Sequence, residues 1–295
     1  MKKTENKYFV SVIIPTLDRA QVLKDSVDDL LALSYEKFEI IIVDQTDHQK
    51  PSIVSYFKKN KKIKYIHITK KSSPHARNVG VKYAKGDIVL FLDDDIRIND
   101  KKFIDYHIQN FKNKKIGLVG GKVVSEFNQK DPGHKEVGKI KYFGLKEVPN
   151  FDANTKMFID HAPGGNMSVY KHIYNQVGGY QEIYKGNAHL EETDFSIRVK
   201  RAGYKLIFEP KAVIKHLAYK TGGNRVRDIY ELRYWLVHNY IVFYLKNYPK
   251  IFFPILFIIK YMWAVFSGIK RKEYKMYCTM SSAIFDGIKY YNTIK

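Results

Sequence analysis

The chain has 295 residues, of which 45% are hydrophobic, enough for one large domain or for a domain with an appendage. Its 51 Lys and Arg residues outnumber 30 Asp and Glu, and the net charge of +21 favours an anionic partner: nucleic acid, an acidic membrane surface or a phosphate-bearing substrate. The single cysteine, Cys278, excludes an internal disulfide and is typical of a reducing compartment. Residues 1–7 are charged and lack the apolar core of a signal peptide, so we expect a cytoplasmic location.

The first third of the chain alternates apolar runs with helical patterns. Buried strands are expected at residues 9–15, where proline stops the strand, and at 38–44, 64–68 and 88–92. Helical patterns lie between them, at residues 22–31, 52–59 and 76–84. Such alternation predicts a mostly parallel sheet with helices on both faces. The lack of alternation between apolar and polar residues within the runs agrees with strands that are buried on both sides.

Beyond residue 116 the pattern is looser. In chain order we expect a strand at 116–121, a polar loop at 128–150, a glycine turn that leads into a strand at 162–170, a helix at 193–202 capped by Gly203, and two strands at 204–208 and 212–216.

The tail, from about Ile229, has a different composition. It holds 18 of the chain's 43 aromatic residues and has 10 Lys and Arg against 3 Asp and Glu. Its most apolar stretch, residues 251–269, is interrupted by Pro254 and Lys260, which disfavours a spanning helix. The composition favours helices that lie in the bilayer interface beside anionic lipid. Helices packed on the catalytic part or on a second subunit, as in a homodimer, and a true span remain alternatives. We expect a catalytic domain at residues 1–228 and a helical extension at 229–295.

The expected strand at 88–92 runs directly into Asp93, Asp94 and Asp95. Open α/β sheets bind ligands at the carboxyl ends of their strands. The mutual repulsion of three carboxylates there favours a bound cation, and hard oxygen ligands suit Mg²⁺ or Mn²⁺. An acidic turn without a ligand is the alternative.

Four segments in this order resemble glycosyltransferase family 2, inverting enzymes of the GT-A fold. They are Val12–Thr16, Ile42–Asp44, the strand that ends in Asp93–Asp95, and Glu191–Asp194 with the helix that follows. The resemblance covers about residues 9–225. It implies a Rossmann-like α/β fold and transfer of a hexose from a nucleotide-sugar, a UDP-sugar first, to a saccharide or lipid-linked acceptor. The donor sugar stays open, because one fold serves many donors.

The resemblance also implies a metal site. Asp95 matches the last acid of the family's Asp-X-Asp motif, which binds the divalent ion that bridges the two phosphates of the donor. Asp93 matches the first acid, near the donor ribose, and Asp94 the variable middle position. His216, after an expected strand, stands where the family often supplies a further metal ligand. A structural histidine is the alternative for that position.

Around the donor, the resemblance implies contacts from further residues. The nucleotide would meet Pro15, Thr16, Asp18, Asp44, Gln45 and Arg77, and the donor sugar would meet Gly164, Gly165 and Asn166. Asp44 corresponds to the acid that binds the imino N–H of uracil or guanine, whereas Gln45 replaces a second acid. A solvated arginine is the alternative for Arg77, and a plain tight turn for the glycines. Arg19 and Arg225 are weaker candidates for phosphate contacts, and His189 for a sugar contact.

Inversion at the anomeric carbon requires a general base for the acceptor hydroxyl. Members of the family carry Glu-Asp near the start of a helix, and the second acid is the base. Glu192 takes that place here, which makes it the first candidate, with Glu191 second and Asp194 third. Asp194 is better suited to capping the helix or binding an arginine. An acidic helix start favoured only by the helix dipole is the alternative for the whole cluster.

Two other classes fit the sequence less well. A nucleotidyltransferase would need a glycine-rich, lysine-bearing phosphate loop after the first strand, and residues 15–19 contain no glycine. A nucleic-acid-binding protein would need a zinc-ligand set or a recognition-helix signature, and the sequence has neither, so no specific nucleic acid is expected. We therefore expect a glycosyltransferase of bacterial polysaccharide or cell-wall glycan synthesis, peripheral on the inner face of the cell membrane.

Overall fold

The computed structural model describes residues 8–125, 135–219, 221–271 and 273–295. Residues 1–7, on which the expectation about a signal peptide depends, lie outside these ranges, as does the start of the loop expected at 128–150. The strands are β1 (Val10–Thr16), β2 (Phe38–Asp44), β3 (Ile63–His67), β4 (Ile88–Leu92), β5 (Ile96–Arg97), β6 (Ile116–Ser125), β7 (Lys139–Lys141), β8 (Lys146–Val148), β9 (Met157–Ile159), β10 (Asn166–Tyr170) and β11 (Lys205–His216). The helices are α1 (Ala20–Leu31), α2 (Pro51–Lys59), α3 (Ser73–Tyr83), α4 (Phe103–Ile108), α5 (Lys171–Gln176), α6 (Glu191–Arg201), α7 (Ile229–Asn247), α8 (Phe253–Arg271) and α9 (Tyr274–Thr293).

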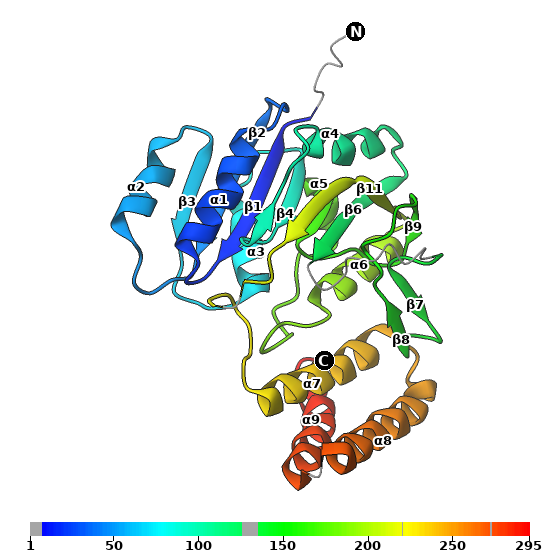
Figure 1. The fold of residues 1–295 in the computed structure, drawn as a ribbon. Coiled ribbons are helices and arrows are strands. Elements are labelled where there is room, and N and C mark those ends of the chain that lie inside the picture. The colour runs from blue at the N-terminus through cyan, green and yellow to red at the C-terminus, as the bar shows by residue number, and fades with distance from the viewer. Residues whose placement is uncertain (1–7, 126–134, 220, 272) are drawn as a thin grey trace.

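The main sheet has the strand order β3-β2-β1-β4-β10-β6-β11-β5, and β9 pairs with β11 (Figure 1). Strands β3, β2, β1 and β4 are parallel to one another, as are β6 and β11, while β10 runs antiparallel to both of its neighbours. The predicted mostly parallel sheet is therefore confirmed. Because β1, β2 and β4 run in the same direction, their carboxyl ends meet at one edge of the sheet.

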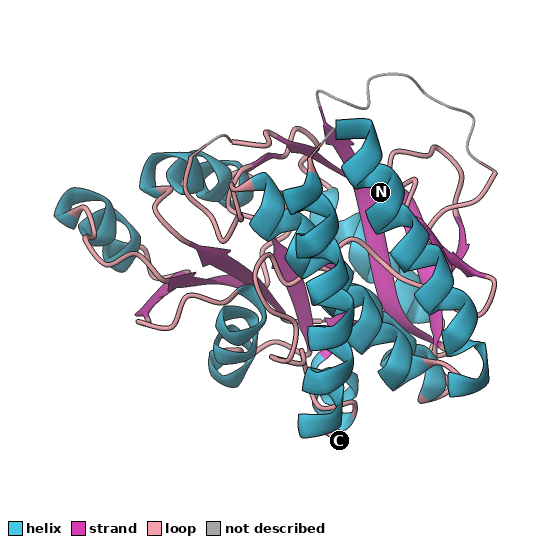
Figure 2. Ribbon diagram, turned by 90° about the horizontal axis from the view of Figure 1, so that it is seen from below, coloured by secondary structure: helices cyan, strands magenta, loops and turns pink. Residues whose placement is uncertain are grey.

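Helices cover both faces of the sheet, as predicted (Figure 2). Alternate residues of β1 belong to two separate cores: Ile13 packs with residues of α3, α5 and α6, whereas Val12 and Ile14 pack with residues of α1, α2 and α4. These three β1 side chains are fully buried. A strand enclosed on both sides has no polar face, which is why the sequence shows continuous apolar runs.

Three local expectations need correction. Pro15 lies inside β1 instead of ending it, because β4 pairs with β1 only as far as Ile13 and the missing N–H of Pro15 falls beyond that ladder. The two strands expected at 204–216 form one strand, β11, with an irregularity between Glu209 and Val213. The hairpin β7–β8 lies within the stretch expected to be a loop.

The last three helices form a cluster beside α6 (Figure 1). They enclose a third core, which includes Val237 and Ile241 of α7 and Met280 and Ile284 of α9. Pro254 does not interrupt α8: it is the second residue of the helix, where a missing N–H breaks no intrahelical bond. Among the described residues, the segment Lys250–Lys270 alone is long and apolar enough to cross a membrane, with a mean hydropathy of 1.8.

Candidate active site

Three adjoining cavities lie at the carboxyl ends of the parallel strands. Their volumes are about 350, 280 and 430 Å³. The first and second cavities share Thr16 and Arg19 as lining residues, and the second and third share Asp93 and His216. The cavities are therefore parts of one continuous cleft at the edge where open α/β sheets bind ligands.

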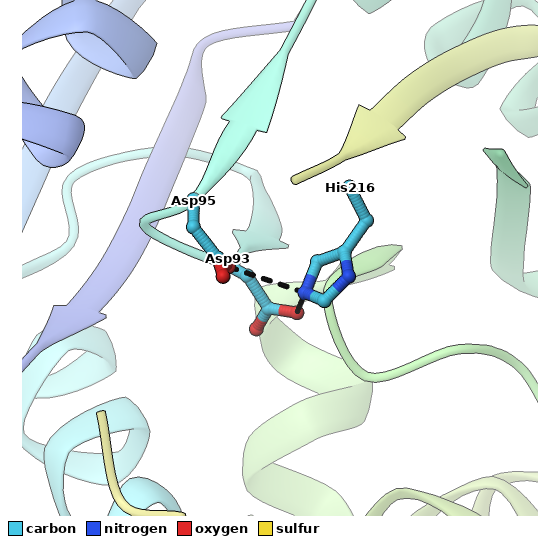
Figure 3. A group of neighbouring side chains, drawn as sticks. All are labelled: Asp93, Asp95 and His216. Carbon is cyan, nitrogen blue, oxygen red and sulfur yellow. Dashed lines mark ion pairs between the residues drawn. The ribbon is translucent and has the colours of Figure 1, made fainter. Parts of the chain in front are cut away.

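Asp93, Asp95 and His216 converge in the second cavity (Figure 3). One ligand atom from each residue lies within 4.8 Å of the other two. The Nε2 atom of His216 is 3.1 Å from Oδ1 of Asp95 and 3.9 Å from Oδ2 of Asp93. The two acids follow β4 and the histidine ends β11, so sheet topology brings together residues that are more than 120 positions apart.

The donor set fits a divalent cation. Oδ1 of Asp95 is buried and faces Nε2 of His216, whereas Oδ2 accepts the backbone N–H of Tyr219. A buried carboxylate oxygen needs a partner, and a metal ion bound by Asp95 and His216 would satisfy it. Two carboxylates and an imidazole suit Mn²⁺, and water would complete the shell of Mg²⁺. The Asp95 carboxylate raises the pKa of His216, and a cation would replace the proton shared between them.

Asp94 is turned away from this convergence. It is buried, and it accepts hydrogen bonds from Oγ1 of Thr16 at 2.7 Å and from Nη1 of Arg19 at 2.8 Å. Burial raises the pKa of Asp94 to about 6, and Arg19 opposes that shift. The same Arg19 nitrogen is 3.0 Å from Oδ2 of Asp95. Asp94 therefore holds Arg19 against the acidic turn, and Arg19 contributes positive charge to the second cavity.

The first cavity is lined by Asp18 and Asp44. One Asp44 oxygen accepts the N–H of Thr46 at 2.8 Å, and the other accepts the hydroxyl of Tyr65, a cavity residue that the sequence analysis did not identify. Gln45 points elsewhere: it lines the second cavity, accepts the N–H of Ser72 and donates to the carbonyl of Thr16. Pro15 and Thr16 also line the second cavity.

Arg77 lines the third cavity and contacts Asp93, which lines both the second and the third cavities. Its side chain is buried, so it is not the solvated arginine of the alternative reading. The guanidinium donates to Glu191 and lies 3.4 Å from Oδ1 of Asp93, and it also contacts the ring of Tyr180. A Cβ atom at Gly165 would lie 2.0 Å from Oδ2 of Asp93, so only glycine permits this approach of the backbone. Gly164 and Gly165 both line the third cavity.

Glu191 and Glu192 are the first two residues of α6, and both line the third cavity. Glu191 is held by Arg77; burial raises the pKa of Glu191 to about 8, and Arg77 opposes that shift. Among the described residues Glu192 makes no ion pair, and burial raises its pKa to about 7. A half-buried, unpaired carboxylate with a pKa near neutrality has the properties of a general base.

Two predicted site residues do not line the cleft. Asn166 is buried within the sheet, where its side-chain N–H groups donate to the carbonyls of Lys122 and Ala212 and its oxygen contacts His107. It therefore joins β10 to its neighbours and lines none of the three cavities. Asp194 is fully buried and lines none of the three cavities.

Asp194 instead joins α6 to α7. Its carboxylate accepts hydrogen bonds from Nε of Arg198 at 2.8 Å, Nζ of Lys246 at 2.6 Å and Nδ2 of Asn247 at 2.8 Å. These donors hold the pKa of Asp194 below its usual range, although burial acts in the opposite direction. The helix that carries Glu191 and Glu192 is thus fixed to the last turn of α7.

Comparisons with known proteins identify the family and the fold. The family model described as Glycosyl transferase family 2 matches residues 11–174. The chain is similar to poly-beta-1,6-N-acetyl-D-glucosamine synthase of Staphylococcus epidermidis, with 31% identity over 115 residues that cover 38% of this chain and 28% of the synthase. It is also similar to glucosyl-dolichyl phosphate glucuronosyltransferase of Haloferax volcanii, with 23% identity over 222 residues, 72% of this chain and 70% of that enzyme.

Among solved structures, the mannosyltransferase PcManGT from Pyrobaculum calidifontis, in complex with GDP-Man and Mn²⁺, superposes with a TM-score of 0.59 at 16% identity. The match covers 96% of this chain and 75% of that one, and it confirms the predicted GT-A fold. The chain spans a quarter or less of the length of the first three curated relatives that it matches.

Proposed function

Since this chain belongs to glycosyltransferase family 2, we propose that it is a metal-dependent inverting enzyme that moves a hexose from a nucleotide-diphosphate sugar to a hydroxyl group. The acceptor is a saccharide or a lipid-linked saccharide. One observation carries the proposal: in a single cleft, the acidic group of Asp93, Asp95 and His216 lies between a cavity large enough for a nucleoside and the unpaired carboxylate of Glu192.

The first cavity is suited to the nucleoside. Asp44 presents a carboxylate that accepts the imino N–H of uracil or guanine, with UDP-sugars as the first candidates. The diphosphate then lies in the second cavity, beside Arg19 and Arg225, whose guanidinium groups contact Asp95. Arginine forks match phosphate oxygens well.

Asp93, Asp95 and His216 would hold the Mn²⁺ or Mg²⁺ ion. When bound, the ion supplies Lewis-acid stabilisation to the departing diphosphate. Arg19 keeps the acidic turn in place through its bond to Asp94.

Glu192 is the proposed base at the opposite end of the cleft. It takes the proton of the acceptor hydroxyl, and that oxygen forms the new bond to the anomeric carbon. The bond between this carbon and the diphosphate oxygen breaks on the other face, so the configuration inverts. Glu191 and Arg77 form the wall behind the sugar and position Asp93.

Thermal unfolding with nucleotides tests the proposal. UDP, GDP, dTDP and CMP are added in turn, each with and without Mn²⁺. One nucleotide is expected to stabilise the protein only when Mn²⁺ is present, by about 2.7 kcal/mol at one hundred times its Kd. If none of the four raises the unfolding temperature under any condition, the proposed donor site is refuted.

The tail supports a location at the inner membrane surface. Large apolar residues on one side of α8 are exposed: Ile255, Ile258, Ile259, Met262, Phe266 and Ile269. We refer to them as the apolar stripe. They recur at helical spacing, as in helices that lie in a bilayer interface. The tail carries 10 Lys and Arg against 3 Asp and Glu, so two copies would repel each other and anionic lipid is the better partner.

Vesicle flotation tests this location. The wild-type chain is expected to float with phosphatidylglycerol vesicles, and the double substitution Ile258→Glu and Phe266→Glu is expected to abolish flotation, because charge on the stripe opposes insertion. The control Tyr83→Glu, at an exposed aromatic residue of α3, should float like wild type. Equal flotation of the double variant, or a dimer that this variant dissociates, would show that lipid does not cover the stripe.

A further inference from the structure

The second and third cavities join at a small set of side chains. Among the described residues, Ser73, Asp93, Asn187 and His216 line both cavities. In the proposed reaction the diphosphate lies in the second cavity, and the base Glu192 lines the third. The anomeric carbon is bonded to the diphosphate and is attacked from the side of the base, so the donor hexose lies where the two cavities join. Asp93 and His216 are assigned to the cation, which leaves Ser73 and Asn187 without a role.

These two side chains differ in their hydrogen bonds. Oγ of Ser73 accepts a hydrogen bond from Nδ2 of Asn224 at 3.1 Å. The half-buried side chain of Asn187 makes no hydrogen bond in the part of the chain that the structure describes, and its Oδ1 atom is buried. A buried amide oxygen without a partner is costly, and the last torsion angle of asparagine is broad enough for the amide to turn. Asn187 therefore offers an unused donor and an unused acceptor at the junction of the cavities.

The loop that carries Asn187 has an unusual backbone. Ala188 and Leu190 have φ values of +54° and +74°, in the left-handed region that residues other than glycine rarely adopt, and Gly186 has a φ of +62°. Such conformations cost free energy and persist only where the surrounding structure fixes them, which is why they cluster at sites that bind ligands. Strain on both sides of Asn187 thus favours a binding role for its side chain.

Helix α7 fixes this loop. Asn239 is fully buried; its Oδ1 atom accepts the backbone N–H of Lys185 at 3.2 Å, and its Nδ2 atom donates to the carbonyl of the same residue at 2.8 Å. The ring of Trp235 lies so close to Gly186 that a Cβ atom there would collide with it. Both residues before Asn187 are therefore held by α7, and the tail positions a side chain of the cleft.

We propose that Asn187 binds a hydroxyl group of the donor hexose and so contributes to the choice of sugar. A hydroxyl group both donates and accepts a hydrogen bond, and the amide offers one group of each kind. The ionised carboxylates nearby only accept hydrogen bonds, and Arg77 only donates them. A sugar without this hydroxyl group would leave the amide unpaired and bind less tightly. This inference rests on the proposed function, and it adds a residue that selects the donor sugar.

Calorimetric titration tests the contact. UDP-glucose, UDP-galactose, UDP-N-acetylglucosamine and GDP-mannose are titrated into the protein in the presence of Mn²⁺, with UDP and GDP as the matched ligands that lack a hexose. For the nucleotide sugar that binds wild type, Asn187→Ala is expected to raise the Kd about tenfold and to leave the Kd of the nucleoside diphosphate unchanged, because one hydrogen bond to the sugar is lost. Asn99→Ala, at an exposed asparagine outside the cleft, should change neither value.

Derivatives of the bound donor that each lack one hydroxyl group identify the contact. One of them is expected to bind wild type about tenfold more weakly than the parent sugar does, since it leaves the Asn187 amide unpaired. The same derivative should bind Asn187→Ala as tightly as the parent does, because the partner of the missing hydroxyl group is already absent.

Three results would overturn the proposal. The first is an equal Kd of the nucleotide sugar for Asn187→Ala and wild type. The second is an equal loss of affinity for the nucleotide sugar and the nucleoside diphosphate, which would assign Asn187 to the diphosphate or to the shape of the loop. The third is that every derivative loses as much affinity in the variant as in wild type. In all three, wild type still binds the nucleotide sugar, so the donor site stands. If no nucleotide or nucleotide sugar binds wild type, the donor site itself is refuted, and this inference with it.

Discussion

Asp95→Asn is expected to eliminate the Mn²⁺-dependent stabilisation by nucleotide and to lower kcat/KM on the order of a thousandfold. The substitution keeps the size of the side chain but removes the charge that would hold the cation. Arg19 retains its bond to Asp94, so the unliganded fold should persist. Thermal unfolding with and without Mn²⁺ measures the first effect, and initial rates measure the second.

The matched control is Glu36→Gln, an exposed carboxylate before β2, at the edge of the sheet away from the cleft. It should leave the metal dependence intact. If Asp95→Asn still gains stability only when Mn²⁺ and nucleotide are both present, the cation is held elsewhere and the proposed ligand set is incorrect.

Glu192→Gln is expected to lower kcat by a factor on the order of 10² to 10⁴ and to leave nucleotide binding unchanged, because the amide has the same shape but accepts no proton. Glu192→Asp, one methylene shorter, should retain part of the activity. Glu191→Gln is expected to act differently. It removes the closer of the two carboxylates that pair with the buried Arg77 and should lower the free energy of unfolding by about 3 kcal/mol.

The pH dependence gives an independent check on the base. Burial raises the pKa of Glu192 to about 7, so its carboxyl group is mostly protonated at pH 6 and mostly ionised at pH 8. Since the ionised form accepts the proton, kcat should rise with pH through about 7 and level off above it. The residual activity of Glu192→Gln should lack this rise. A full rise in that variant would identify another group as the base.

Local patterns in the sequence were sufficient to predict the sheet and the acidic strand end. The apolar runs of β1, β2 and β4 identify strands that are buried on both faces, and parallel pairing places the residues after them at one edge. Gly203, predicted to cap the helix expected at 193–202, has a φ of +93° and follows Ala202, the C-cap residue of α6. These features are determined by residues that are close together in the sequence, so local patterns are enough to predict them.

Contacts between residues that are far apart in the sequence could not be predicted in the same way. Tyr65 bonds Asp44 from the neighbouring strand, and nothing in the local sequence distinguishes it from other strand tyrosines. The position of Asn166 after two glycines led to the prediction of a ligand contact. Its hydrogen bonds to the carbonyls of Lys122 and Ala212 instead depend on strand pairings that the sequence does not specify. The partner of Asp194 on α7 lies more than fifty residues away.

The buried carboxylate of Asp194 also limits where this polypeptide can be divided. A fragment that ends at residue 228 would lose Lys246 and Asn247, two of its three donors, and leave an ionised group in an apolar interior two residues from Glu192. A fragment that retains α7 would keep all three donors, but it would also need α9, because Val237 and Ile241 of α7 are buried in one core with Met280 and Ile284 of α9. Exchange of the tail at residue 228 is therefore expected to fail unless the incoming helices supply both the donors to Asp194 and an apolar face for this core.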